Sequence, residues 1–281
     1  MINYNGNISN ETKVLAFNNR GFNYGDALFE TIKVSHGKIL FWEDHYFRLM
    51  ASMRIMRMEI PMEFTLEFLE AQIQQTLIAN NLEKKAARVK LMVNRVSGGF
   101  YFPENNDVEY LIQAAALNED LYKETNAIYV VDLFKDYYVS PSLLSTLKTN
   151  NKALQVIGSI YAKENNLNNC LVLNTNKQVI EALNGNLFLV KGKTIKTPPL
   201  NDGCLKGIMR KQLMEIIELL PDYTLEESSI SAFELQKADE LFISNVMVGV
   251  QPITNYRKKS YTNTVATALI KKLNIKIRLS N

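Results

Sequence analysis

A lysine and a glutamate near the middle of the chain have types and surroundings that could share one reaction. Lys148 follows a small polar run and precedes a predicted helix, and Glu181 lies further along in a mostly apolar segment of short predicted strands. A lysine amine can form a Schiff base with pyridoxal 5'-phosphate (PLP), and a carboxylate in an apolar setting can keep the pyridine nitrogen protonated. Either residue alone would more simply be a solvated side chain, but together they indicate a PLP site.

The cofactor phosphate would need an anion site, and several segments offer parts of one. Gly207 opens an amphipathic helix, so the backbone N–H groups of Ile208 and Met209 could bind an anion that the glycine lets approach closely. Arg48, on a predicted helix in the first half of the chain, could add a planar guanidinium. Asn245, directly after a buried type of strand, could add a backbone N–H and an amide.

The composition is that of a globular protein, and it does not favour binding to nucleic acid or insertion in a membrane. The 281 residues are 47% hydrophobic and 22% charged, and the net charge is +3. This charge is too small to argue for nucleic acid, and no apolar run approaches the length of a membrane span. The first residues lack the basic and apolar regions of a signal peptide, so we expect a cytoplasmic protein.

Cysteine and histidine are scarce, which argues against several other classes of enzyme. The two cysteines, Cys170 and Cys204, argue against a disulfide framework and fit a reducing compartment. With only His36 and His45 in addition, a multi-histidine or cysteine-rich metal site is nearly excluded, and we predict no metal. A serine hydrolase is disfavoured because the sequence contains no GxSxG elbow.

Hydrophobic periodicity predicts a small α+β domain over residues 1–117, a polar linker over 118–126 and a larger domain over 127–281, which carries Lys148. In the first domain we expect strands over 13–18, 28–34, 39–41, 88–93 and 108–115, and helices over 43–58 and 65–79. In the second we expect strands over 127–133 and 241–244, a meander over 170–197, and helices over 152–165, 207–220 and 264–273. The fold class is therefore α/β (α+β).

The chain resembles the class IV (fold type IV) PLP enzymes over nearly its whole length, through motifs that follow the order of that family. Besides Lys148 and Glu181, these are RGFxYGDxxFET at 20–31, HxxRL at 45–49, NxF at 186–188, TPxL at 197–200 and GIxR at 207–210. Each motif alone is a weak signal, but the ordered set is strong.

The resemblance implies a two-domain fold like that of D-amino acid aminotransferases, with PLP in the interdomain cleft of a homodimer. It assigns Lys148 to the Schiff base, Glu181 to the ring nitrogen and Arg48 to the phosphate. The phosphate would also meet the following residues: Gly207, Ile208, Met209, Asn245 and Val246. Val246 is a departure, because it lacks the hydroxyl that many relatives give the phosphate.

Three features favour one branch of this family, the 4-amino-4-deoxychorismate lyases. Ala153 stands where branched-chain aminotransferases typically carry a tyrosine, five residues after the lysine. The loop over 95–102 lacks the histidine with which D-amino acid aminotransferases hold the substrate carboxylate, and its Ser-Gly-Gly-plus-tyrosine pattern is closer to the lyases. Thr31, Asn151 and Asn245 also resemble the lyases.

We therefore expect a lyase that converts aminodeoxychorismate into pyruvate and 4-aminobenzoate, a folate precursor. Lys148 would remove the ring proton at the carbon that bears nitrogen, and Thr31 would help to deliver a proton to the leaving enol. The candidate substrate contacts are Tyr24, Tyr101 and Arg95. The alternative is a class IV aminotransferase that acts on branched-chain or D-amino acids.

Overall fold

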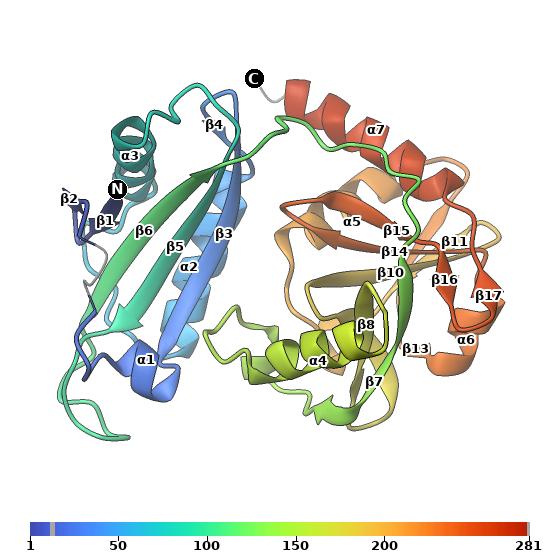
Figure 1. The fold of residues 1–281 in the computed structure, drawn as a ribbon, viewed down its shortest axis with the longest axis horizontal. Helices are drawn as coiled ribbons and strands as arrows, with labels where there is room; N and C mark the ends of the chain where they lie inside the picture. The colour runs from blue at the N-terminus through green and yellow to red at the C-terminus, as the bar shows by residue number, and fades with distance from the viewer. Residues whose placement is uncertain (12–14, 280–281) are drawn as a thin grey trace. The chain divides into compact units, whose positions relative to one another are not determined.

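The computed structural model describes residues 1–11 and 15–279, which form two compact units (Figure 1). The first unit consists of Met1–Leu121 and Leu147–Asn151, and the second of Tyr122–Thr146 and the chain from Lys152 onward. The segment that carries Lys148 thus makes its contacts in the first unit, although the sequence placed it in the larger domain. The expected boundary at residue 117 and the linker over 118–126 stay predictions. Over the described residues, each helix is too short or too polar to span a bilayer.

The first unit is built on an antiparallel sheet with strand order β2-β1-β6-β5-β3-β4. The strands are β1 (Ile2–Tyr4), β2 (Asn7–Ser9), β3 (Ala27–Ser35), β4 (Lys38–Ile39), β5 (Ala87–Arg95) and β6 (Val108–Ala116). Along β5 the buried residues Val89, Leu91 and Val93 alternate with the partly exposed Arg88, Lys90 and Met92. This alternation is that of a sheet with one face in a hydrophobic core and one face open.

Two helices, α2 (Trp42–Ile55) and α3 (Leu66–Ala79), pack on the core face of this sheet (Figure 1). Their apolar residues, including Leu49, Met53, Leu69, Ile73 and Leu77, meet those of the strands. A third and short helix, α1 (Arg20–Tyr24), precedes β3. The side chain of Asn19 caps it by accepting from the N–H of Phe22 at 2.9 Å.

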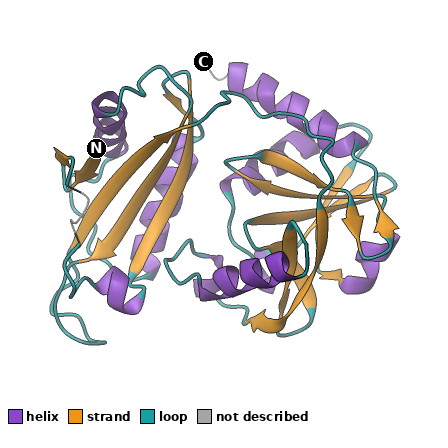
Figure 2. Ribbon diagram, in the orientation of Figure 1, coloured by secondary structure: helices purple, strands orange, loops and turns teal. Residues whose placement is uncertain are grey.

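The second unit contains an eleven-stranded mixed sheet with helices around it (Figure 2). Its strands are β7 (Val130–Val139), β8 (Asn169–Asn174), β9 (Gln178–Ala182), β10 (Gly185–Lys191), β11 (Thr194–Thr197), β12 (Thr224–Glu227), β13 (Ile230–Ser231), β14 (Glu240–Asn245), β15 (Gly249–Ile253), β16 (Asn255–Tyr256) and β17 (Lys259–Ser260). Its helices are α4 (Ala153–Glu164), α5 (Ile208–Glu218), α6 (Ala232–Lys237) and α7 (Thr264–Leu279), with 3-10 turns at Leu144–Thr146 and Leu200–Asp202. Helices α5 and α7 pack against each other beside β14.

The predicted helices and most predicted strands are present with shifted ends, and helix α7 is longer than predicted. The strand predicted over 13–18 is wrong for residues 15–18, and its first two residues lie outside the described part of the chain. Residues 15–18 form a turn, in which the N–H of Asn19 donates to the carbonyl of Ala16 at 3.0 Å. Phe17 is 87% exposed, so its apolar ring is not packed in a core, as the strand prediction had assumed.

Candidate active site

Lys148 lies beside the first half of strand β3, where a short strand-like pairing fixes its backbone. The N–H of Phe29 donates to the carbonyl of Lys148 at 2.9 Å, and the N–H of Asn150 donates to the carbonyl of Ala27 at 2.9 Å. Leu28 and Thr149 form an antiparallel bridge between these two bonds. The ammonium nitrogen of Lys148 lies 4.3 Å from the centroid of the Phe29 ring. The lysine amine therefore has a defined place on the first unit.

Thr31 lies two residues beyond Phe29 on the same strand, so both side chains project from the same face of the sheet. The threonine is only 8% exposed and pairs across the sheet with Lys90 of β5. The structure thus places the Thr31 hydroxyl on the face that carries the Phe29 ring and the Lys148 amine.

Glu30, His45 and Arg48 form a buried cluster between β3 and helix α2. Oε1 of Glu30 accepts from Nε of Arg48 at 2.8 Å, and Oε2 accepts from Nη2 of Arg48. Nδ1 of His45 lies 2.6 Å from the same Oε2. The side chains of Glu30, His45 and Arg48 are 2%, 0% and 8% exposed, so these bonds are sheltered from water. Arg48, predicted to bind the phosphate, is thus engaged at two points by a carboxylate.

Burial and the neighbouring charges set the protonation states of this cluster. Burial by itself would raise the pKa of Glu30, but the charge of Arg48 and the bond from His45 outweigh it and lower the pKa to about 2. For His45, burial is the largest cause and lowers the pKa, Glu30 opposes this, and Arg48 and Lys148 lower it further. At neutral pH the imidazole is therefore neutral and carries its proton on Nδ1, because an ionised carboxylate can only accept.

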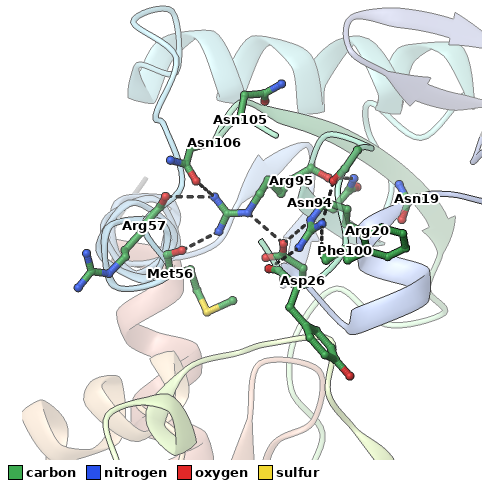
Figure 3. Close-up of polar contacts among 12 residues, drawn as sticks. Asn19, Arg20, Asp26, Met56, Arg57, Asn94, Arg95, Phe100, Asn105 and Asn106 are labelled. Carbon is green, nitrogen blue, oxygen red and sulfur yellow. Dashed lines mark hydrogen bonds and ion pairs between the residues drawn. The ribbon is translucent and has the colours of Figure 1, made fainter. Parts of the chain in front are cut away.

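A second polar network joins helix α1 to strand β5 through one carboxylate. Oδ2 of Asp26 accepts from Nε of Arg20 at 2.9 Å and from Nε of Arg95 at 2.9 Å (Figure 3). Arg95 also donates to the carbonyls of Met56 at 2.7 Å and Arg57 at 3.1 Å. The guanidinium of Arg95, predicted to contact the substrate, is thus largely occupied inside the protein.

Arg20 extends this network to the loop that follows β5. Its Nη1 donates to the carbonyls of Gly98 at 2.9 Å and Phe100 at 2.6 Å. Its guanidinium carbon lies 5.0 Å from the centroid of the Tyr24 ring, and that ring lies 5.8 Å from the ring of Tyr101. A cavity of about 290 Å³ opens here, lined by Arg20, Tyr24, Gly25, Asp26, Met56, Arg95, Tyr101, Pro103 and Asn151. The three predicted substrate residues, Tyr24, Tyr101 and Arg95, thus line one cavity of the first unit.

In the second unit, Glu181 and Asn186 bind the main-chain N–H and carbonyl of one residue, Leu205. They are cross-strand neighbours on β9 and β10. Oε2 of Glu181 accepts from the N–H of Leu205 at 2.8 Å, and Nδ2 of Asn186 donates to the carbonyl of Leu205 at 2.8 Å. Glu181 is 9% exposed, so the buried carboxylate that the sequence pointed to is indeed in a sheltered place. The two side chains fix the chain just before helix α5.

Helix α5 begins at Gly207, which provides no side-chain cap for the first-turn N–H groups of Ile208 and Met209. A Cβ at Gly207 would lie 1.9 Å from Oδ1 of Asn186. A larger residue at this position would therefore have to displace the Asn186 side chain, which is bonded to the carbonyl of Leu205. The first turn presents its positive end with no side-chain cap from Gly207.

On the prediction that the cofactor phosphate binds at Gly207, the variant G207A is expected to weaken PLP binding about ten-fold or more, because the added methyl would push the helix start away from Asn186. The affinity is measured by fluorescence titration of the apoprotein with PLP. The double variant N186A/G207A, which removes the clashing oxygen, should bind PLP more tightly than G207A. Equal affinity of G207A and the wild type for PLP would contradict a phosphate bound close to Gly207.

Asn245 and Val246 lie at the turn from β14 to β15. Oδ1 of Asn245 accepts from the N–H groups of Met247 at 2.9 Å and Val248 at 3.1 Å, and Nδ2 donates to the carbonyl of Asn184 at 3.0 Å. The Asn245 amide thus shapes this turn. The carbonyl of Val246 accepts from the hydroxyl of Tyr122 at 2.8 Å. A phosphate contact from this turn stays a prediction.

Sequence reasoning gave no role to Glu30, Asp26, Arg20 or Asn186, although all four occur in the quoted motifs. The signal for Glu30 is a carboxylate within an otherwise apolar strand, which demands a buried partner. For Asp26 and Arg20 no such local signal exists, because Arg95, the second arginine on Asp26, is far along the chain.

Comparison with known proteins shows that the chain matches one family, whose similar members are named as different kinds of enzyme. The family profile described as amino-transferase class IV matches residues 27–256. An aminodeoxychorismate lyase of Vibrio harveyi is 25% identical over 238 residues, covering 84% of this chain and 84% of its own. A D-alanine aminotransferase of Listeria monocytogenes is 24% identical over 258 residues, covering 88% of this chain and 84% of its own.

Among solved structures, the branched-chain aminotransferase of Thermoproteus uzoniensis with norvaline superimposes with a TM-score of 0.87. The two chains are 21% identical, and the match covers 97% of this chain and 92% of the other. At this level of identity the likeness shows the fold, and it confirms the predicted two-sheet α/β architecture. The reaction has to be argued from the site.

Proposed function

Because the chain belongs to the class IV aminotransferase family, whose enzymes use PLP, we propose that it is a 4-amino-4-deoxychorismate lyase of folate precursor synthesis. The observation that carries this proposal is Thr31, on the same strand face as the Phe29 ring that Lys148 covers. A transaminase can move protons with its lysine alone, whereas a lyase must also protonate a leaving enol. A second proton donor on the strand face that carries the lysine amine supports the lyase.

The chemistry of the residues proposed to hold PLP fits the cofactor, and these residues belong to both units. The first unit supplies Lys148 for covalent attachment and Arg48 for the phosphate. The second unit supplies Glu181 for the ring nitrogen and the uncapped start of helix α5 at Gly207, where a Cβ would not fit.

PLP supplies an electron sink for the pair left behind when a proton is removed from the substrate carbon that bears nitrogen. In the proposed reaction Lys148 removes that proton. The bond from the ring carbon to the enolpyruvyl oxygen then breaks and leaves its electron pair on that oxygen. The Thr31 hydroxyl delivers a proton to the leaving enolate, and the proton that Lys148 removed restores the threonine hydroxyl. The products are aromatic 4-aminobenzoate and pyruvate. Glu181 keeps the cofactor nitrogen protonated throughout.

The cavity lined by Tyr24, Tyr101 and Arg95 supports a role of these residues in substrate recognition. Arg20 and Arg95 against Asp26 give the lining a net positive charge, which favours a carboxylate substrate. The proposal further includes a homodimer in the cytoplasm. The exposed aromatic run over 100–102 supports the dimer, since such apolar patches commonly become covered by a partner.

An aminotransferase is the second candidate, because the same residues can serve it. The resemblance to a D-alanine aminotransferase and to the fold of a branched-chain aminotransferase supports this candidate. Transamination would need Lys148, Glu181 and Arg48. It contains no leaving enol for the Thr31 hydroxyl to protonate.

The deciding experiment follows 4-aminobenzoate and pyruvate released from enzymatically generated aminodeoxychorismate by the PLP-loaded protein. We expect both products in equal amounts. The variant T31V, which keeps the shape but removes the hydroxyl, should slow release about 10²-fold, the usual effect of losing a general acid. The variant T31S should stay within a few-fold of the wild type.

Half-reactions with L- and D-amino acids serve as the control on the same preparations. Amino-group transfer to the cofactor without any release of 4-aminobenzoate would overturn the lyase in favour of the aminotransferase. Release that is equally fast in T31V and the wild type would remove Thr31 from the mechanism while leaving the lyase in place.

A further inference from the structure

We propose that Glu30 and His45 are positioning residues that hold Arg48 in its phosphate-binding orientation, an inference that rests on the proposed role of Arg48. Arg48 lies on helix α2 and Glu30 on strand β3, so the contact joins two different elements of the first unit. Two parallel bonds, from Nε to Oε1 and from Nη2 to Oε2, fix the plane of the guanidinium. A single bond would leave that plane able to rotate.

The geometry of His45 points to one task. It precedes Arg48 by three residues on α2, so both side chains leave the same side of the helix. Its Nδ1 meets Oε2 of Glu30 at 2.6 Å, while its Nε2 is buried and has no hydrogen-bond partner among the described residues. A buried polar atom without a partner is costly. The imidazole therefore leaves Nε2 without a hydrogen bond, while Nδ1 binds the carboxylate that orients Arg48.

The charge of the cluster is compatible with an anion nearby. Glu30 carries one negative charge, and Arg48 and Lys148 carry positive charges, while His45 is neutral because burial lowers its pKa. Glu30 thus orients Arg48, and the net charge of the cluster with Lys148 stays positive. Holding the guanidinium before the ligand arrives avoids most of the side-chain entropy that a long, flexible arginine would otherwise lose on binding.

The test compares the affinity of the apoprotein for PLP and for pyridoxal, which lacks the phosphate. The variant E30Q keeps the shape of Glu30 but removes its charge. We expect E30Q to weaken PLP binding about ten-fold, the size of losing one charge-assisted bond, while the affinity for pyridoxal stays within two-fold. Equal losses for both ligands would show a general structural role and overturn the proposal.

A double-variant cycle separates this proposal from the role of Arg48 itself. If Glu30 acts through Arg48, then E30Q has no further effect on PLP affinity in the R48A background. An additional ten-fold loss in R48A/E30Q would overturn the positioning role. If R48A alone leaves PLP affinity unchanged, the phosphate role of Arg48 fails, whereas the product-release assay still decides the lyase.

Variants of His45 keep the inference testable if E30Q does not fold. In H45N the amide nitrogen can replace Nδ1 as donor to Glu30, while H45L removes the donor and fills the same space. We expect H45N to bind PLP like the wild type and H45L to bind it several-fold more weakly, with pyridoxal binding unchanged in both. Equal PLP affinity in H45N and H45L would overturn the role of His45.

Discussion

The variant K148A is expected to lose at least about 10⁴-fold in turnover, because one residue is proposed both to attach the cofactor and to move the proton. The Lys148 backbone is paired with β3 through the N–H of Phe29, and its ammonium lies over the Phe29 ring. Lys90 also lies near that ring, at 5.2 Å, but it belongs to a different strand, β5.

Turnover is measured with both the lyase substrate and amino acids, and cofactor attachment by the visible absorbance of the PLP-loaded protein and by mass after borohydride reduction. K135A, at an exposed position on β7, is the matched control and should behave like the wild type. Added methylamine should restore part of the K148A turnover by accepting the proton in place of the side chain. A reduced K148A protein that still carries the cofactor mass would assign the attachment to another lysine.

The variant D26N is expected to destabilise the protein by about 3 to 5 kcal/mol, the usual cost of breaking a buried charge pair on one side. Asp26 is the shared acceptor of Arg20 and Arg95, whose side chains are only 4% and 7% exposed. Without its charge, two guanidinium groups lose their common counter-charge. The asparagine keeps the size of the side chain, so the loss reports on charge rather than on a cavity.

The free energy of unfolding is measured by urea titration. D132N removes a charge from the exposed pair of Asp132 with Arg257, at 3.1 Å, and should change the stability by at most about 1 kcal/mol. D26N should also make the loop around Gly98 and Phe100 more sensitive to protease, since Arg20 holds both carbonyls. A D26N protein as stable as D132N would mean that the arginines are satisfied without Asp26.

Local patterns in the sequence predicted most helices and strands, because each carries its own signal of apolar spacing. The strand over 13–18 failed for residues 15–18 because such a pattern does not indicate whether a neighbouring strand exists. The candidate site divides in the same way. Lys148 and Glu181 were proposed from residue type and surroundings and their roles stay predictions, whereas the family and its cofactor are confirmed.

Contacts between residues far apart in the chain could not be predicted from the sequence. Arg95 was expected to contact substrate because of its place in a loop motif, but nothing nearby indicated its ion pair with Asp26. Its substrate role stays a prediction, now with four of its guanidinium hydrogens engaged inside the protein. The joint hold of Glu181 and Asn186 on Leu205 likewise depends on a loop that returns to the sheet.

The segment Leu147–Asn151 interrupts the second unit and contributes its contacts to the first. The polypeptide therefore passes from one unit to the other three times, and no single cut divides the gene into two self-sufficient modules. A fragment that ends at residue 121 would lack the lysine, and a fragment that starts there would carry it without the strand that fixes it. Recombination at a domain boundary, a common route to new enzymes, would thus separate Lys148 from its support. We expect the two parts of this chain to be inherited together.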